Sequence, residues 1–314
     1  MMNYITKSPV LFLIFNRPDT TQRVFNEIRA AKPPRLYIAS DGPRIDREND
    51  VLLCQEALSI VQLIDWECKV ERLVRPDNLG CKHAISSAID WFFENEEEGI
   101  ILEDDCLPAK SFFYYCDTLL EKYRLDTRIR HIAGANLQGG KKWGDASTYF
   151  TNQTHVWGWA SWRRVWKDYD KELSRYEEDE VADKMSNIFT DPFVIADWAR
   201  IFKELKAGKI DTWDYQLAFL NYFNHGLSIN PNVNLISNIG FREDATHTLA
   251  LESPYANVPL QEISEITIPK YILPEKKADY AVLEYDFNLK ERWRKHNLLR
   301  RRFKRWLKLQ FKNS

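Results

Sequence analysis

The 314-residue sequence has no strong net charge, no paired cysteine motif and no hydrophobic run long enough to cross a bilayer. Its formal net charge of −2 at pH 7 gives no overall basic field for binding nucleic acid. The five cysteines form no CxxC pair and are odd in number, which disfavours a disulfide framework or zinc site and favours a reducing cytoplasm. The longest apolar runs, such as residues 10–15, fall far short of the roughly 20 residues that span a membrane. The first residues also lack a signal-peptide pattern, so we expect a soluble cytoplasmic protein.

Glycine-rich phosphate-binding loops are absent as well. The first apolar run is followed by residues 15–19 (FNRPD), and neither GxGxxG nor GxxxxGK[ST] occurs. A Rossmann dinucleotide site and a P-loop are therefore unsupported. If the protein binds phosphate groups, their charge needs another partner. A divalent cation held by carboxylates is the obvious one.

What the sequence does contain is an alternation of strand-type and helix-type segments. Strands are expected at residues 10–15, 35–40, 68–74, 100–102 and 129–133, and helices at 19–31, 50–64, 81–94 and 111–123. This alternation predicts an α/β fold with a mainly parallel, twisted sheet flanked by helices. Ligands of such sheets bind at the carboxyl ends of the strands.

Polar residues follow several of the predicted strands at this ligand-binding edge. Asn16 and Arg17 follow the first strand, Asp41 the second, and Glu103, Asp104 and Asp105 the fourth. Three adjacent carboxylates repel one another, and burying them unpaired is costly. Either the triplet is a solvated loop, or a cation that carries nucleotide phosphates lies beside it.

Three motifs in fixed order carry a resemblance to a known family. Residues 101–105 (ILEDD), residues 77–80 (DNLG) and the first strand with Asn16 and Arg17 together resemble GT-A-fold glycosyltransferases. The similarity is to the N-acetylglucosaminyltransferase I type and its bacterial relatives, and it covers roughly residues 8–248. It implies the GT-A (nucleotide-diphospho-sugar transferase) fold, with a nucleotide-binding half at 1–135 and an acceptor half at 136–248.

The resemblance also implies roles for individual residues. Asp105 would bind Mn²⁺ or Mg²⁺, which bridges the donor diphosphate, while Glu103 and Asp104 support the metal shell and contact the ribose. The other donor-binding residues would be Asn16, Arg17, Asp41, which reads the uracil, and Asn78, Gly80 and Lys82, which border the nucleotide. The alternatives are structural: a cap on a strand end for Arg17, and nothing more than a turn for Asp41.

The second half of the chain supplies candidates for the sugar side. Residues 155–166 are densely aromatic, and Trp157, Gly158 and Trp159 are expected to line the site, whereas Trp162 and Trp166, at i and i+4 of a helix, are expected to pack. Trp213 is assigned to the same sugar and acceptor platform. In the family a Trp-Asp pair provides the catalytic base, which makes Asp214 the candidate here, with Asp211 as the competitor. A purely structural role for Asp214 at a helix N-terminus is the alternative.

The last part of the chain contains a loop, a connector and a basic helix. Arg242 and His247 fall in a loop that in the family closes over the sugar nucleotide, although a lone histidine is more often structural. Residues 249–288 are predicted to form an extended connector. Residues 289–314 are predicted to form a basic amphipathic helix, which favours attachment to an anionic membrane surface over packing on the protein body or on a partner.

The sequence therefore predicts a metal-dependent hexosyl- or N-acetylhexosaminyltransferase. Its donor would be a nucleotide sugar, with UDP as the expected nucleotide, and its acceptor a glycan or lipid-linked hydroxyl. Family likeness implies inversion, and the expected setting is bacterial polysaccharide biosynthesis, in the cytoplasm or peripherally on the inner face of the membrane. A sugar-phosphate nucleotidyltransferase would need a glycine-rich loop after the first strand, and a non-catalytic glycan-binding protein would not need Asp105 and Asp214 together.

Overall fold

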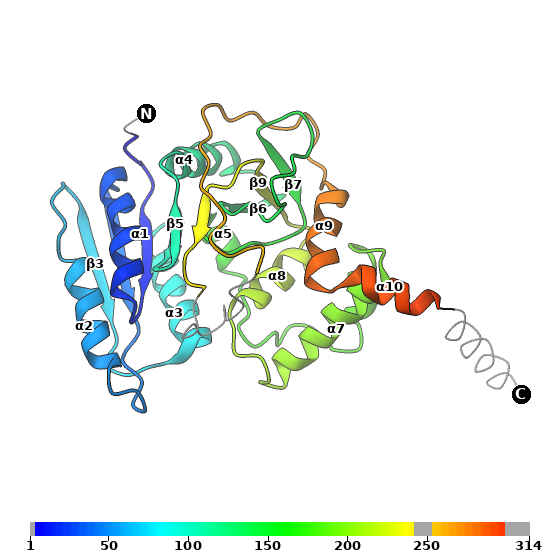
Figure 1. Cartoon of the computed structure of the whole chain (residues 1–314), viewed down its shortest axis with the longest axis horizontal. Helices are drawn as coiled ribbons and strands as arrows, with labels where there is room; N and C mark the ends of the chain where they lie inside the picture. The colour runs from blue at the N-terminus through cyan, green and yellow to red at the C-terminus, as the bar shows by residue number, and fades with distance from the viewer. Residues whose placement is uncertain (1–3, 242–252, 299–314) are drawn as a thin grey trace, which may run out of the picture.

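The computed structural model describes residues 4–241 and 253–298, and a central eight-stranded sheet organises them (Figure 1). The strands lie in the order β3 (Lys69–Val74), β2 (Arg35–Ser40), β1 (Val10–Ile14), β4 (Glu98–Glu103), β8 (Trp159–Trp162), β6 (Ile129–Ala133), β9 (Leu227–Pro231) and β7 (Thr148–Thr151). The first four strands are mutually parallel and β6 is parallel to β9, whereas β8 and β7 run antiparallel to their neighbours. The predicted α/β fold with a mainly parallel sheet is confirmed.

Helices connect the parallel strands, as the alternating pattern predicted. They are α1 (Pro18–Ala31), α2 (Asp50–Ile60), α3 (Gly80–Asn95) and α4 (Ser111–Tyr123). Edge strand β3 is partly exposed, whereas the central strands, for example Val10–Ile14, are buried on both faces. Such strands need a continuous apolar run, which explains why the run itself was readable from the sequence.

The aromatic segment 157–166 departs from the prediction at one point. Trp162 was expected on a helix with Trp166, but it ends strand β8, and the short helix α5 (Arg163–Trp166) begins directly after it. The strand forms because β8 pairs with both β4 and β6, an interaction between distant segments that overrides the local i, i+4 spacing. Both tryptophans are buried, so their expected packing role is confirmed.

A second hydrophobic cluster lies beside the sheet and is mostly helical. It is formed by α6 (Val181–Ser186), α7 (Pro192–Lys206) and α8 (Asp214–Phe223), together with Leu283 and Leu289 from the C-terminal part of the chain. Residues 276–286 of the segment predicted as an extended connector form helix α9 (Lys276–Asp286). Figure 1 shows α9 at the opposite end of the molecule from α2 and β3.

The described part of the basic C-terminal region, helix α10 (Leu289–Asn297), packs on α7. Leu289 is fully buried, Trp293 Nε1 donates to Asp191 Oδ2 at 2.7 Å, and Arg292 pairs with Asp197. For these residues the structure shows packing on the protein body. Residues 299–314, on which most of the expected membrane-binding face depends, lie outside the described residues. Among the described helices, none has the length and apolar character needed to cross a bilayer.

The buried histidine His131 on β6 gives a pH-dependent contribution to stability. Its ring stacks on Trp159 at 5.1 Å and its Nε2 hydrogen-bonds the His155 carbonyl at 2.8 Å. Burial lowers the pKa of His131 to about 4, whereas an unfolded histidine titrates near 6.5. Below pH 6.5 the unfolded chain therefore binds a proton that the folded protein excludes, and this contribution to stability is lost as the pH falls towards 4.

We expect protonation of His131 in the unfolded chain to lower the free energy of unfolding by about 2 kcal/mol between pH 7 and pH 5. Urea unfolding at both pH values measures this for the wild type and for His131→Gln, which keeps a side-chain N–H donor. The variant should be less stable at pH 7, because the ring stacking is lost, but its decline between the two pH values should be smaller. An equal decline in both proteins would contradict the assignment.

Candidate active site

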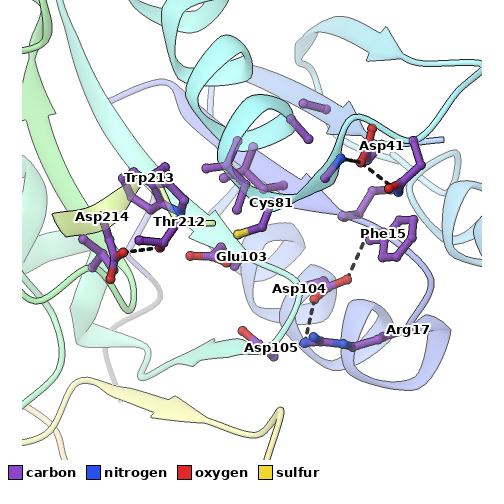
Figure 2. A pocket seen from close by; sticks show the side chains of 18 of the residues that line it. Phe15, Arg17, Asp41, Cys81, Glu103, Asp104, Asp105, Thr212, Trp213 and Asp214 are labelled. Carbon is purple, nitrogen blue, oxygen red and sulfur yellow. Dashed lines mark hydrogen bonds and ion pairs between the residues drawn. The ribbon is translucent and has the colours of Figure 1, made fainter. Parts of the chain in front are cut away.

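A cavity of about 270 Å³ lies at the carboxyl ends of β1, β2 and β4 (Figure 2). Its walls come from five parts of the chain: residues 13–17, 39–44, 75–85, 103–105 and 212–214, with Val156, Trp157 and Asn238 between them. The predicted ligand-binding edge of the sheet is therefore hollow. It brings Arg17, Asp41, Asn78 and Gly80 together with the acid triplet.

Asp104 and Asp105 are both buried, and each has a cationic or N–H partner. Asp104 Oδ2 accepts from the backbone N–H of Phe15 at 3.0 Å, which ties the connection between β1 and α1 to the end of β4. Asp105 Oδ2 accepts from Arg17 Nη1 at 2.5 Å. Burial opposes the charge on Arg17, but Asp104 and Asp105 outweigh it and raise the pKa of the guanidinium. Arg17 thus belongs to the acid cluster.

Glu103 is the least compensated member of the triplet. Within residues 4–241 and 253–298, no side chain or backbone N–H donates a hydrogen bond to its carboxylate. Burial, and then repulsion by Asp105 and Asp104, raises the pKa of Glu103 well above its ordinary value. In Figure 2 the side chains of Glu103 and Asp105 point into the open space between Arg17 and Asp214.

The acid cluster can hold a divalent cation only if a bound ligand completes the coordination of the cation. No group of three or more His, Cys, Asp or Glu side chains in the described part of the chain is arranged to hold a metal by itself. Glu103 and Asp105 nevertheless direct carboxylate oxygens into the cavity, and Mg²⁺ or Mn²⁺ is commonly held by one or two carboxylates plus ligand phosphates. The residues fit a cation whose coordination is completed by a bound phosphate ligand.

Asp41 organises the loop that borders the cavity. Its carboxylate accepts from the backbone N–H groups of Leu79 and Gly80 at 3.0 and 3.2 Å, and from Asn78 Nδ2 at 2.9 Å. These bonds satisfy free donors at the start of α3. Burial raises the pKa of Asp41, although the backbone donors lower it. Asp41 lines the cavity and also fixes residues 78–80, so its predicted contact with a base remains a prediction.

Two predicted donor-binding residues do not line the cavity. Asn16 Nδ2 donates to Asp50 Oδ1 at 2.8 Å, and Asp50 in turn binds Arg44. Lys82 Nζ pairs with Glu172 at 2.9 Å. Both side chains hold neighbouring segments in place, so any role in donor binding would be indirect.

The predicted aromatic platform is divided by the fold. Trp157 and Trp213 line the cavity, although Trp213 is only 3% exposed. Trp159 is 1% exposed, and its ring stacks on that of Trp213 with the ring centroids 5.9 Å apart. Neither face of the Trp159 ring is therefore open to a sugar ring. Gly158 has φ +56°, and an added Cβ would overlap Ile236, so glycine is required there for packing rather than for ligand approach.

The two candidate catalytic bases are separated by the structure. Asp214 lines the cavity at the first position of α8, and its Oδ1 accepts from the Thr212 hydroxyl. Asp211 is exposed and does not line the cavity. Arg242 and His247 lie outside the described residues, so their predicted roles stay predictions.

Sequence reasoning missed two arginines in the cavity. Arg44 lies over the Phe15 ring at 5.3 Å and pairs with Asp50, and Arg75 Nη2 donates to Ser87 Oγ at 2.8 Å. Burial lowers the pKa of Arg75, and the nearby charge of Asp41 offsets only part of this effect. Arg75 follows the end of β3, so the rule used for the other strand ends could have found it.

Gly240 is a third missed residue, and it yields a prediction. Strand β10 (Ile236–Asn238) pairs with β5 (Cys106–Pro108), after which Ile239 N–H donates to the Asp105 carbonyl at 2.8 Å. A Cβ on Gly240 would overlap the Asp105 carboxylate. Gly240→Ala should therefore displace that carboxylate and weaken the metal-dependent nucleotide binding that the sequence predicts, by about tenfold or more.

Calorimetric titration of UDP with and without Mn²⁺ measures the effect of Gly240→Ala. Gly139→Ala is the control, because its added methyl group meets no atom within 4 Å. Gly139 has φ +58°, so alanine also strains the backbone there, but Gly139 is exposed and does not line the cavity, so only Gly240→Ala should reduce the gain in affinity expected from Mn²⁺. Equal affinities in the two variants would show that Gly240 does not constrain Asp105.

Comparisons with known proteins leave the family open. No family model matches the sequence, and no curated protein matches it. Among solved structures, a UDP-glucose pyrophosphorylase complexed with UDP-glucose is 10% identical, over 72% of this chain and 90% of that one, with a TM-score of 0.38. HddC from Yersinia pseudotuberculosis is 12% identical, over 52% of this chain and 80% of that one, with a TM-score of 0.32. A CMP:2-keto-3-deoxy-manno-octonic acid synthetase complexed with CTP is 14% identical, over 61% of this chain and 87% of that one, with a TM-score of 0.34. Likenesses this distant assign neither family nor activity.

Proposed function

We propose that the protein is a metal-dependent glycosyltransferase that moves a sugar from a nucleotide diphosphate donor, with UDP as the expected nucleotide, to a hydroxyl of a glycan or lipid-linked acceptor. One observation carries the proposal. The acids at the end of β4 and the carboxylate of Asp214 face a single cavity, which is large enough for part of a nucleotide. A transferase of this kind needs both: one acidic group to hold a cation on the diphosphate, and one carboxylate to accept a proton.

The donor would lie along the carboxyl edge of the sheet. Glu103 and Asp105 would hold the divalent cation, and Arg44 and Arg75 would add positive charge to the same cavity. The bound cation would neutralise the charge that develops on the leaving diphosphate. Arg17, already paired with Asp105, would remain beside the phosphates and limit the repulsion within the triplet.

Asp214 would act as the base. Its Oδ1 is engaged by Thr212, which leaves Oδ2 to accept the proton of the acceptor hydroxyl. The negative charge of Asp214 is favoured at the N-terminus of α8. In a single displacement the acceptor oxygen bonds to the anomeric carbon as the bond from that carbon to the diphosphate oxygen breaks, and the proton passes to Asp214. Such a displacement inverts the configuration.

Calorimetric titration of UDP with and without Mn²⁺ tests the donor site. We expect Mn²⁺ to strengthen UDP binding by about tenfold or more, and a panel of UDP-sugars to show metal-dependent release of UDP. Failure of the metal to strengthen binding would contradict the proposal. If pyrophosphate instead converted a UDP-sugar to UTP and a sugar phosphate, the protein would be a nucleotidyltransferase.

A further inference from the structure

A second cavity, of about 1030 Å³, opens beside the first. Val156, Trp157 and Asp214 line both cavities, so Asp214 lies at their junction. The far wall comes from α8 and from residues 283–288, which close helix α9 and lead into α10. Residues 283–288 of this wall lie beyond residue 248, in the part of the chain outside the family resemblance.

Aromatic rings extend from the junction into the second cavity. The ring centroids of Trp157 and Tyr255 are 6.5 Å apart, and those of Tyr255 and Tyr285 are 5.1 Å apart, both with edge-to-face geometry. Tyr285 is 54% exposed, and Tyr255 is held in place by a 3.0 Å hydrogen bond from its hydroxyl to Asp286 Oδ1. A partly exposed row of amphipathic rings suits a ligand with both apolar C–H faces and hydroxyl groups.

The charges around the second cavity are unbalanced. Among the described residues, three carboxylates line it, those of Asp214, Glu284 and Asp286, against the one ammonium of Lys290, which pairs with Glu284 at 2.9 Å. His155 adds no charge at neutral pH, because burial lowers its pKa to about 4. Carboxylates accept hydrogen bonds from hydroxyl groups but repel anions. The lining therefore favours an uncharged, hydroxyl-rich ligand.

We propose that the second cavity binds an uncharged oligosaccharide as the acceptor, with its reacting hydroxyl at Asp214 and its outer sugars on Tyr255 and Tyr285. This inference rests on the proposed transferase function. The volume lies at the upper end of the roughly 300–1,000 Å³ typical of ligand pockets, which suits more than one sugar unit. Asp286 fixes Tyr255 and offers its second oxygen to a sugar hydroxyl.

An array of immobilised neutral and uronic-acid-containing oligosaccharides, probed with the full chain in the presence of UDP and Mn²⁺, tests the proposal. We expect binding to neutral members, and loss of that binding by about 30-fold in Tyr285→Ala. Tyr280→Ala is the matched control, because Tyr280 is an exposed tyrosine of α9 that does not line the cavity. Preference for the acidic glycans, equal binding by the two variants or no glycan binding at all would overturn the inference.

The UDP titration separates this inference from the proposed function. Tyr285→Ala should keep metal-dependent UDP affinity within about twofold of the wild type, because the ring lies outside the first cavity. If UDP binds normally and glycan binding is insensitive to Tyr285→Ala, only the acceptor assignment fails. If glycans bind as expected but UDP binding gains nothing from the metal, the transferase proposal fails and a glycan-binding protein remains. Thermal melting checks that both variants are folded.

Discussion

Asp214→Asn should lower the turnover of UDP-sugar by about 10³-fold, because a carboxamide cannot accept the proton of the attacking hydroxyl. The substitution keeps the size of the side chain and the oxygen that accepts from Thr212, so the start of α8 should be undisturbed. Release of UDP from UDP-sugar, followed with a coupled assay in the presence of Mn²⁺, measures the effect. The affinity for UDP should stay within about twofold of the wild type.

Asp211→Asn is the matched control for this prediction. Asp211 lies three residues earlier in the same segment, but it is exposed and does not line the cavity. Its variant should turn over UDP-sugar at close to the wild-type rate. Full turnover in Asp214→Asn, or a loss confined to Asp211→Asn, would show that the base is assigned to the wrong carboxylate.

Asp105→Ala should abolish the gain in UDP affinity expected from Mn²⁺, a loss of about tenfold or more at saturating metal. The variant removes the buried carboxylate that faces the cavity and leaves Arg17 without its closest acid. UDP binding in the absence of metal should change much less, because Arg17, which keeps only its longer 3.5 Å contact with Asp104, can then pair with a phosphate. Calorimetric titrations with and without Mn²⁺ separate the two effects.

Asp46→Ala is a suitable control for Asp105→Ala. Asp46 is an acid on an exposed loop, with a side chain that is 79% exposed, and it does not line the cavity. Its removal changes the net charge by the same amount as Asp105→Ala. The metal-dependent gain should survive in Asp46→Ala. If the gain also persists in Asp105→Ala, the cation is not held by the triplet.

The fold was predictable where local pattern and final environment agree. A helix from Ser111 to about Tyr123 and a strand over Ile129–Ala133 were predicted from the sequence, and α4 and β6 have these bounds. Helix periodicity was misleading at Trp162, because β8 is held by pairing with β4 and β6, which lie far away in the sequence. The helix within residues 276–286 was missed for a similar reason. Its buried residues Ala278, Val282 and Leu283 gain their packing partners only from other parts of the chain.

The predicted parts of the site share one origin. Arg17, Asp41 and the acid triplet each follow a strand, and the parallel arrangement places them at one edge. Residues that approach from elsewhere had no such signal. Gly240 is next to Asp105 only because β10 pairs with β5, and Tyr255 and Tyr285 reach the second cavity from beyond the sheet. Their positions depend on long-range packing that no local pattern encodes.

By itself the sequence determined β1, β2, β3, β4 and β6 of the mainly parallel sheet and the polar side chains that follow them, because buried strands require continuous apolar runs. It also placed Glu103, Asp104 and Asp105 at the ligand-binding edge. Only the tertiary structure decided how these acids differ: Asp104 is tied to Phe15, Asp105 to Arg17, and Glu103 is left with a raised pKa. It also put Asp214 rather than Asp211 at the junction of two cavities. The reason is that charge compensation and cavity walls depend on side chains brought together from distant segments.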